Sequence, residues 1–174
     1  MIEELVYLSS EMRLPRIVTW FANDCLTPEQ LNRTLAEWWT SDEFPHSLGI
    51  RRLVRMFKAA GFVTDTEGVT VPTAPFMAFR GGATSHLKGC LWTLDEGAAA
   101  WFAQRTKLFR QCPVTVASAE IPVRHVLGTF PGGNEAEVVV NPFGLRGLVL
   151  QTTDADDPRL QQAAQQWRVK QSTS

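Results

Sequence analysis

Apolar residues in the first part of the chain recur at the spacing of amphipathic helices. Leu31, Leu35 and Trp38 follow one another at intervals of four and three residues, as the buried stripe of a helix does. Thr27 precedes them as a candidate N-cap, with a proline directly after it and Gln30 three residues later. This pattern predicts a helix that begins just after Thr27 and packs one face against the core.

A second helix is expected over about residues 46–60, with Gly61 at its end. Its core-facing stripe consists of Ile50, Leu53, Val54 and Phe57. The opposite face carries Arg51, Arg55 and Lys58, which lie four and three residues apart and therefore side by side. We interpret these cations as a solvated helix face; contact with an acidic target, a tRNA or a cofactor diphosphate is the alternative.

From Val69 onward the apolar runs shorten to the length of strands and are separated by glycine and proline. The expected strands cover residues 75–80, 90–93, 114–121, 123–127, 137–140 and 148–151. One helix interrupts them, from Asp95 as its cap to about Arg105. A polar helix begins at Asp157-Pro158, and its many glutamines predict an exposed, weakly anchored element.

The order of these elements predicts an α+β protein. A helical N-terminal segment (residues 1–70) packs on a β-rich core (71–152), and a C-terminal helix with a mobile tail (153–174) follows. The length of 174 residues suits one compact domain. A hydrophobic fraction of 44% and a net charge of −1 are ordinary for a soluble protein and give no overall attraction to nucleic acid or acidic membranes.

Targeting signals and cysteine usage add two expectations. No stretch approaches the roughly 18 apolar residues of a membrane span, and the first residues lack the basic region of a leader. We therefore expect a cytoplasmic protein without a membrane partner. Cys25, Cys90 and Cys112 are odd in number and form no Cys-x-x-Cys pair, which predicts reduced thiols and no metal site.

Arg80 stands at the end of an apolar strand and is the first candidate for chemistry. A guanidinium is charged at any working pH, and its fork of donors suits a phosphate or diphosphate better than lysine does. Gly81 and Gly82 follow, and glycines let a ligand approach the backbone. A phosphate clamp is thus one interpretation, and a surface residue that ends a strand is the other.

Glu135 and Glu137 are two residues apart at the start of a run of three valines. On a strand this spacing directs both carboxylates to one face. A carboxylate beside a sugar stabilises the positive charge that develops when an N-glycosidic bond breaks. We assign that role to Glu137, and Glu135 is expected to orient or deprotonate the attacking group. Two glutamates on a solvated strand face are the alternative.

The order of these motifs resembles a known family. Phe79-Arg80-Gly81 is followed by the Trp92-Thr93 segment, by a helix, and by a Glu-x-Glu sequence at the start of a strand. This arrangement is similar to the ADP-ribosyltransferases of the arginine/serine-threonine-serine/glutamate type, over about residues 75–142. The resemblance implies the split, mainly antiparallel β-sheet of those enzymes, with NAD as the substrate and no metal.

The resemblance also implies a role for each matching residue. Arg80 would bind the ribose-phosphate part of NAD, and the backbone of Gly81 would hold the nicotinamide carboxamide. Glu137 would be the catalytic carboxylate, and Glu135 would help to activate the acceptor.

The central motif departs from the family pattern. Leu91-Trp92-Thr93 stands where Ser-Thr-Ser is expected, so a leucine replaces the serine that supports the catalytic glutamate. Thr93 keeps one hydroxyl and is expected to support the cofactor site. Trp92 either stacks on the nicotinamide or adenine ring or fills the core. Losing a hydrogen bond that orients a carboxylate weakens transition-state stabilisation more than it weakens binding.

Two function classes follow from these residues. The first is a mono-ADP-ribosyltransferase that cleaves the nicotinamide-ribose bond of NAD and transfers ADP-ribose to a cytosolic macromolecule, a protein rather than a nucleic acid. The second is a non-catalytic module of the same fold that binds NAD or a partner, suggested by Leu91. A glycosidase is a poorer third choice, because Arg80 beside two glycines suits a phosphate-bearing substrate.

Overall fold

The computed structural model of the protein describes residues 2–41, 48–133, 135–145 and 150–172. The helices are α1 (Ser10–Ala22), α2 (Pro28–Trp38), α3 (Ile50–Ala60), α4 (Glu96–Arg110) and α5 (Pro158–Ser172), with short 3-10 helices that include η1 (Ile2–Tyr7), η2 (Trp39–Ser41) and η5 (Val123–His125). The strands are β1 (Val63–Thr64), β2 (Phe76–Ala83), β3 (Leu91–Thr93), β4 (Val114–Ile121), β5 (Val126–Phe130), β6 (Glu137–Val140) and β7 (Gln151–Asp154).

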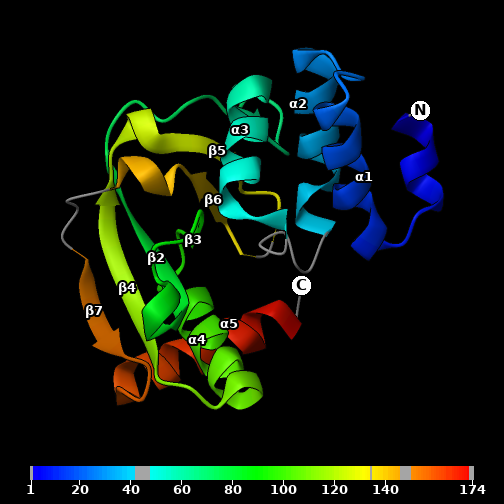
Figure 1. Ribbon diagram of the computed structural model, residues 1–174. Helices are drawn as coiled ribbons and strands as arrows, with labels where there is room; N and C mark the ends of the chain where they lie inside the picture. The colour runs from blue at the N-terminus through cyan, green and yellow to red at the C-terminus, as the bar shows by residue number, and fades with distance from the viewer. Residues whose placement is uncertain (1, 42–47, 134, 146–149, 173–174) are drawn as a thin grey trace.

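Within the described residues, the strands form one seven-stranded sheet in the order β1-β5-β6-β3-β2-β4-β7. Neighbouring strands are antiparallel except β1 and β5, which are parallel. The predicted α+β class and the mainly antiparallel sheet are therefore confirmed. Figure 1 shows α1, α2 and α3 together beside the β5–β6 part of the sheet, and α4 and α5 next to β2.

The pairing between strands is shortest in the middle of the sheet, between β2 and β3. β2 pairs with β4 along its full length, but its ladder with β3 has a single pair in the described chain, Phe79 opposite Thr93. Thr93 in turn lies opposite Glu137, and Glu137 lies opposite Phe130. Directly opposed residues share a face of a sheet, so these four side chains form one row across the joint between two halves.

Two groups of helices cover this face. Phe79 packs with the cluster that α4 and α5 form against β4, whereas Phe130 belongs to the cluster of the N-terminal helices. The opposite face of the sheet has a core of its own, with Ala78, Trp92 and Val138. Glu137 thus lies between the side chains that the N-terminal helices pack on this face and those that α4 packs on it.

The sequence signals for α2 and α4 are confirmed. The Thr27 hydroxyl accepts from the Gln30 backbone while the Gln30 side chain accepts from Thr27, which is the reciprocal capping box. Asp95 caps α4 by accepting from the backbone of Gly97 and Ala98. α4 runs on to Arg110, five residues past the expected end, and stops where Gln111 adopts φ 48°.

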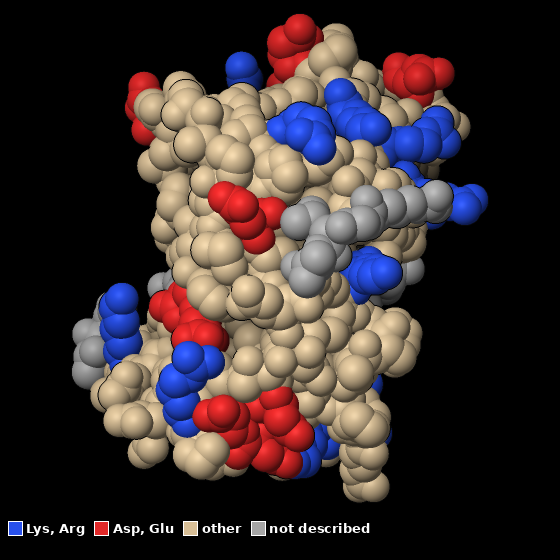
Figure 2. Space-filling model, turned by 90° about the vertical axis from the view of Figure 1, so that its left-hand side faces the viewer, with Lys and Arg blue, Asp and Glu red and all other residues tan. Residues whose placement is uncertain are grey.

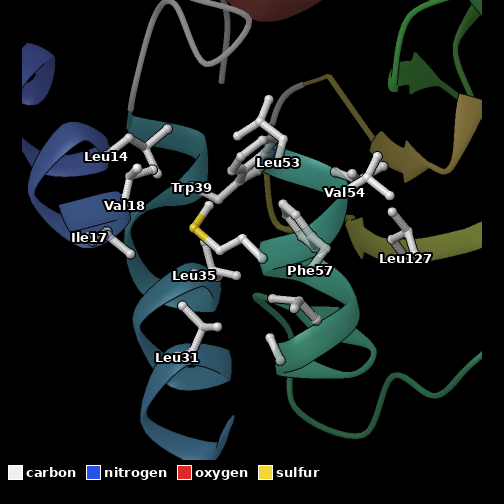
Figure 3. Packing of buried hydrophobic residues seen from close by; sticks show 14 of the residues in the cluster. Leu14, Ile17, Val18, Leu31, Leu35, Trp39, Leu53, Val54, Phe57 and Leu127 are labelled. Atoms are coloured by element: carbon white, nitrogen blue, oxygen red, sulfur yellow. The ribbon is translucent and has the colours of Figure 1, made fainter. Parts of the chain in front are cut away.

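The stripe predicted for α2 is confirmed, since Leu31 and Leu35 are buried and Trp38 packs against the same core cluster. Trp38 is only half-buried, with the Arg13 guanidinium 4.4 Å from its ring centre. Trp39, the first residue of η2, is 1% exposed and points toward α3 beside Leu53 and Phe57 (Figure 3). The chain tightens into a 3-10 turn after Trp38, which rotates the next side chain into the core.

Several element boundaries differ from the sequence prediction. Residues 1–70 include a strand, β1, which extends the sheet beyond β5. The strand expected at 123–127 starts at Val126, because η5 turns the chain after Pro122. The last strand covers Gln151–Asp154, while positions 148 and 149 of the expected strand lie outside the described residues. The same is true of residues 46 and 47 in the second predicted helix and of the tail residues 173–174.

The C-terminal helix is firmly packed, contrary to the expectation of a weakly anchored element. Leu160, Ala164 and Trp167 of α5 are buried at intervals of four and three residues. The Trp167 ring lies 5.2 Å from that of Trp101 on α4. The glutamines occupy the outer face, so the polar composition conceals one apolar stripe.

The surface carries charges of both signs. Figure 2 shows several Lys and Arg side chains together in the upper part of one face, with Asp and Glu elsewhere on it. Arg51, Arg55 and Lys58 of α3 are exposed, as a solvated helix face requires. Among the described helices, none has the length and apolar character to span a lipid bilayer.

Candidate functional site

Arg80 extends into the joint between the two halves of the sheet. Its guanidinium donates a hydrogen bond to the Leu91 carbonyl on β3, where the ladder with β2 has ended. A Cβ at Gly89 would come within 2.3 Å of Arg80 Nη2, so any other residue at this position would require the guanidinium to move. Burial lowers the pKa of Arg80, while the thiolate form of Cys90 and the carboxylate of Glu137 act in the opposite direction. The guanidinium is therefore a desolvated cation held within the sheet.

Glu137, the first residue of β6, is half-buried and bonded to a side chain from the N-terminal segment. Its Oε1 accepts from Trp39 Nε1 at 2.7 Å. Burial raises its pKa to about 7. The Trp39 hydrogen bond and the charge of Arg80 lower this pKa, while the charges of Glu135 and Asp65 raise it. Arg80 and Glu137, 57 residues apart along the chain, are thus close enough to interact electrostatically.

Glu135 is not on the strand that was expected to direct it. It lies in the turn before β6, and Ala136 between the two glutamates adopts φ 43°. This left-handed conformation breaks the two-residue alternation of a strand. The expectation that spacing alone places both carboxylates on one strand face is therefore wrong. Burial also raises the pKa of Glu135, and the charge of Arg105 on α4 opposes the rise.

Thr93 holds the turn that carries Glu135. Its buried hydroxyl donates to the Glu135 carbonyl and accepts from the backbone N–H of Asp95 at 3.0 Å. The Leu94 N–H donates to the Ala136 carbonyl at 3.1 Å in the same place. The end of β3 and the start of α4 are thereby tied to the Glu-x-Glu turn. Thr93 therefore supports the site by holding the backbone of the turn, through its bonds to Glu135 and Asp95.

Gly81 is required by helix packing, whatever else it does. A Cβ at this position would lie 1.7 Å from the Ala99 carbonyl oxygen of α4. Its backbone is paired with Val116 on the β4 side. Its predicted contact with a nicotinamide carboxamide remains a prediction.

Trp92 has the core role of the two roles considered for it. It is 2% exposed, its Nε1 donates to the Gly89 carbonyl at 3.1 Å, and it packs with Ala78 and Val138. No face of the ring is left for a ligand to stack on.

Two residues of this site were not found in the sequence. Trp39 is 98 residues from the carboxylate it binds. Asp65 follows β1, accepts from the Gly132 N–H at 3.2 Å and thereby holds the loop before the glutamates. The only feature of the sequence that pointed to Trp39 was its place next to Trp38 at the end of the first helical stripe, and no feature pointed to Asp65.

Two shallow hollows lie near α2 on the surface of the described residues. One, of about 380 Å³, lies between α2 and the segment after β1, and the other, of about 550 Å³, lies along α2 itself. Neither is lined by Arg80, Glu135 or Glu137. No cluster of metal-ligating side chains occurs in the part of the chain that the structure describes.

No family model, curated protein or solved structure matches the chain. The function is therefore argued from the arrangement itself. The Arg80 guanidinium and the Glu137 carboxylate, whose pKa is raised, come from the two strands that flank β3 and interact electrostatically, and a second carboxylate lies on the adjoining turn. A cation for phosphate beside a carboxylate for a developing positive charge suits cleavage of a nucleotide's glycosidic bond.

Proposed function

We propose that the protein is a mono-ADP-ribosyltransferase, which cleaves the nicotinamide-ribose bond of NAD and transfers ADP-ribose to a protein acceptor. The observation that carries the proposal is that Arg80 and Glu137 come from the two strands that flank β3 at the joint of the sheet, where they interact electrostatically. The motif order that suggested the enzyme class would be accidental if these residues lay on separate surfaces. Alternation along β2 directs Arg80 away from the row that contains Glu137, but its guanidinium reaches β3 where the ladder between β2 and β3 has ended. Its electrostatic interaction with Glu137 across β3 supports a common role.

Each group has a defined part in the proposed reaction. One N–H donor of Arg80 bonds Leu91, and a guanidinium has five, which leaves donors for an NAD phosphate. Glu137 in its ionised form stabilises the positive charge on the ribose as the bond to nicotinamide breaks. Nicotinamide leaves with the bonding electrons, and the acceptor adds to the same ribose carbon. Glu135 accepts the proton that the acceptor loses.

The raised pKa of Glu137 sets a pH dependence for this reaction. The carboxylate is the active form, and about half of it is ionised near pH 7. Nicotinamide release should therefore increase as the pH rises from 6 to 8. A rate that is constant over this range would contradict the assignment of Glu137 as the charge-stabilising group.

A nicotinamide-release assay with purified protein tests the proposal, and labelled NAD with cell lysate tests transfer. Glu137→Gln should lower the rate by roughly 100-fold or more, because the developing charge loses its carboxylate. Glu120→Gln is the matched control, since Glu120 is exposed on β4. Arg80→Ala should weaken NAD binding, and its thermal unfolding must be measured alongside because it also removes the bond to Leu91.

A non-catalytic NAD-binding module is the second candidate. Leu91, an aliphatic residue at the position where the family's serine supports the glutamate, favours it. Calorimetry with NAD separates the two functions. Binding without nicotinamide release supports the module, turnover that Glu137→Gln abolishes supports the transferase, and the absence of both binding and turnover contradicts both.

A further inference from the structure

Trp39 connects the N-terminal helical segment to the carboxylate of Glu137. The indole lies in the core, 1% exposed, with its edge against Phe57 at 4.7 Å and stacked on Phe130 at 6.1 Å between ring centres. Figure 3 shows Trp39 among the apolar side chains of α2 and α3. From this position its Nε1 reaches Glu137 Oε1 at 2.7 Å. The donor is therefore fixed by packing on two sides.

The chemistry of the indole makes this contact selective. Trp Nε1–H donates and cannot accept, so it bonds an oxygen lone pair and gives a carboxyl proton no acceptor. A rigid donor at hydrogen-bond distance thus favours the ionised form and fixes one carboxylate oxygen in place. A serine hydroxyl, which rotates and also accepts, imposes a weaker constraint.

The neighbouring residues of the central motif do not supply such a donor. Leu91 has an aliphatic side chain and pairs with Val139, two residues along β6 from Glu137. The Thr93 hydroxyl lies opposite Glu137 but is engaged by the Glu135 carbonyl and the Asp95 N–H. Among the described residues, Trp39 is the side chain that donates to the Glu137 carboxylate.

We propose that Trp39 is a positioning residue for Glu137, and that it supplies from the helical segment the hydrogen bond that Leu91 cannot supply. The inference rests on the proposed function only in taking Glu137 as the catalytic carboxylate. It explains how a chain without the central serine keeps its glutamate oriented. It also makes the helical segment part of the site, because Trp39 follows α2 directly and packs on α3.

The charges around Glu137 define the expected sign. Arg80 lowers the pKa of Glu137, Glu135 and Asp65 raise it, and burial is the largest cause of its rise to about 7. Trp39 lowers it. Removing the indole donor while leaving these other groups in place should therefore raise the pKa further. A hydrogen bond to a charged group contributes about 1.5 kcal/mol or more, which corresponds to roughly one pH unit.

The experiment is an NMR titration that needs no turnover. In the wild-type protein, the indole N–H signal of Trp39 should titrate with a midpoint near pH 7, and Glu137→Gln should abolish that titration. In Trp39→Phe, the carboxyl carbon of Glu137 should titrate about one pH unit higher. The matched control is Trp38→Phe, which removes an indole from the neighbouring residue.

A second control separates positioning from stability. Leu31→Ala should lower the melting temperature by removing a buried side chain of the same hydrophobic cluster, and it should leave the Glu137 midpoint unchanged. An indole signal of Trp39 that is flat from pH 5 to 9 while Glu137 titrates would overturn the inference. So would a Glu137 midpoint that Trp39→Phe does not move. If Trp39→Phe does not fold, the wild-type titration alone decides.

The two proposals fail in different ways. If the titrations behave as expected but no nicotinamide is released, the transferase assignment falls and the contact between Trp39 and Glu137 stands. If nicotinamide is released and the acidic limb of the pH–rate profile is identical in wild type and Trp39→Phe, the positioning role falls and the transferase assignment stands. With both correct, the limb moves to higher pH by the same interval as the Glu137 midpoint.

Discussion

The burial of Glu137 should make the protein less stable as the pH rises, and Glu137→Gln should remove much of this effect. Folding transfers the carboxyl group to a place where its pKa is about 7, compared with 4.5 for an ordinary glutamate. Between these values the folded chain keeps a proton that the unfolded chain has lost. The charged form is therefore the one that folding penalises.

The sign and the size follow from linkage. Stability from this group is fully present below pH 4.5 and is lost as the pH rises through about 7. A difference of about 2.5 pH units corresponds to about 3 kcal/mol at 1.36 kcal/mol per unit. Glutamine is uncharged, so this loss should be absent from the variant. Its Oε1 still accepts from Trp39, and any cost of burying its amide is the same at every pH.

Urea unfolding at pH 5, 6, 7 and 8.5 measures the effect. The free energy of unfolding of Glu137→Gln, relative to wild type, should increase by up to about 3 kcal/mol across this range. Glu135 also has a raised pKa and is present in both proteins, so its own burial cancels, and its repulsion of Glu137 is part of the difference that the comparison measures. Glu120→Gln, at an exposed position, should follow wild type at all four pH values. A difference between Glu137→Gln and wild type that does not change with pH would refute the burial argument.

Two further predictions concern packing. Gly81→Ala should lower the free energy of unfolding by at least about 2 kcal/mol, because the new methyl group would collide with the Ala99 carbonyl of α4. Gly82→Ala is the control, because no atom lies within 4 Å of its new methyl group, and its melting temperature should be close to that of wild type. Equal melting temperatures for Gly81→Ala and Gly82→Ala would contradict the close approach of α4 to Gly81. At pH 8 iodoacetamide should label the exposed Cys25 but leave Cys90 unmodified until urea is added, since Cys90 is 2% exposed and burial raises its pKa to about 11. Mass spectrometry distinguishes the sites, and labelling of both at equal rates would contradict the burial of Cys90.

The sequence by itself determined the elements whose signals are local. The Thr27 capping box and the Asp95 cap involve residues two or three positions apart, and both helix starts were predicted correctly. The strands Val114–Ile121 and Glu137–Val140 also agree at both ends, because short apolar runs between turn residues define them. The order of the motifs was sufficient to propose Arg80 with Glu137 as a pair.

Only the tertiary structure decided how these residues are held. Trp39 meets Glu137 because η2 turns one indole into the core and packing on Phe130 fixes it there. Glu135 leaves the strand because the chain adopts a left-handed conformation at Ala136. Contacts between residues distant along the chain depend on how helices and sheet pack together. A local pattern carries no signal for such packing, so the sequence named the groups of the site while the fold set their partners and their pKa values.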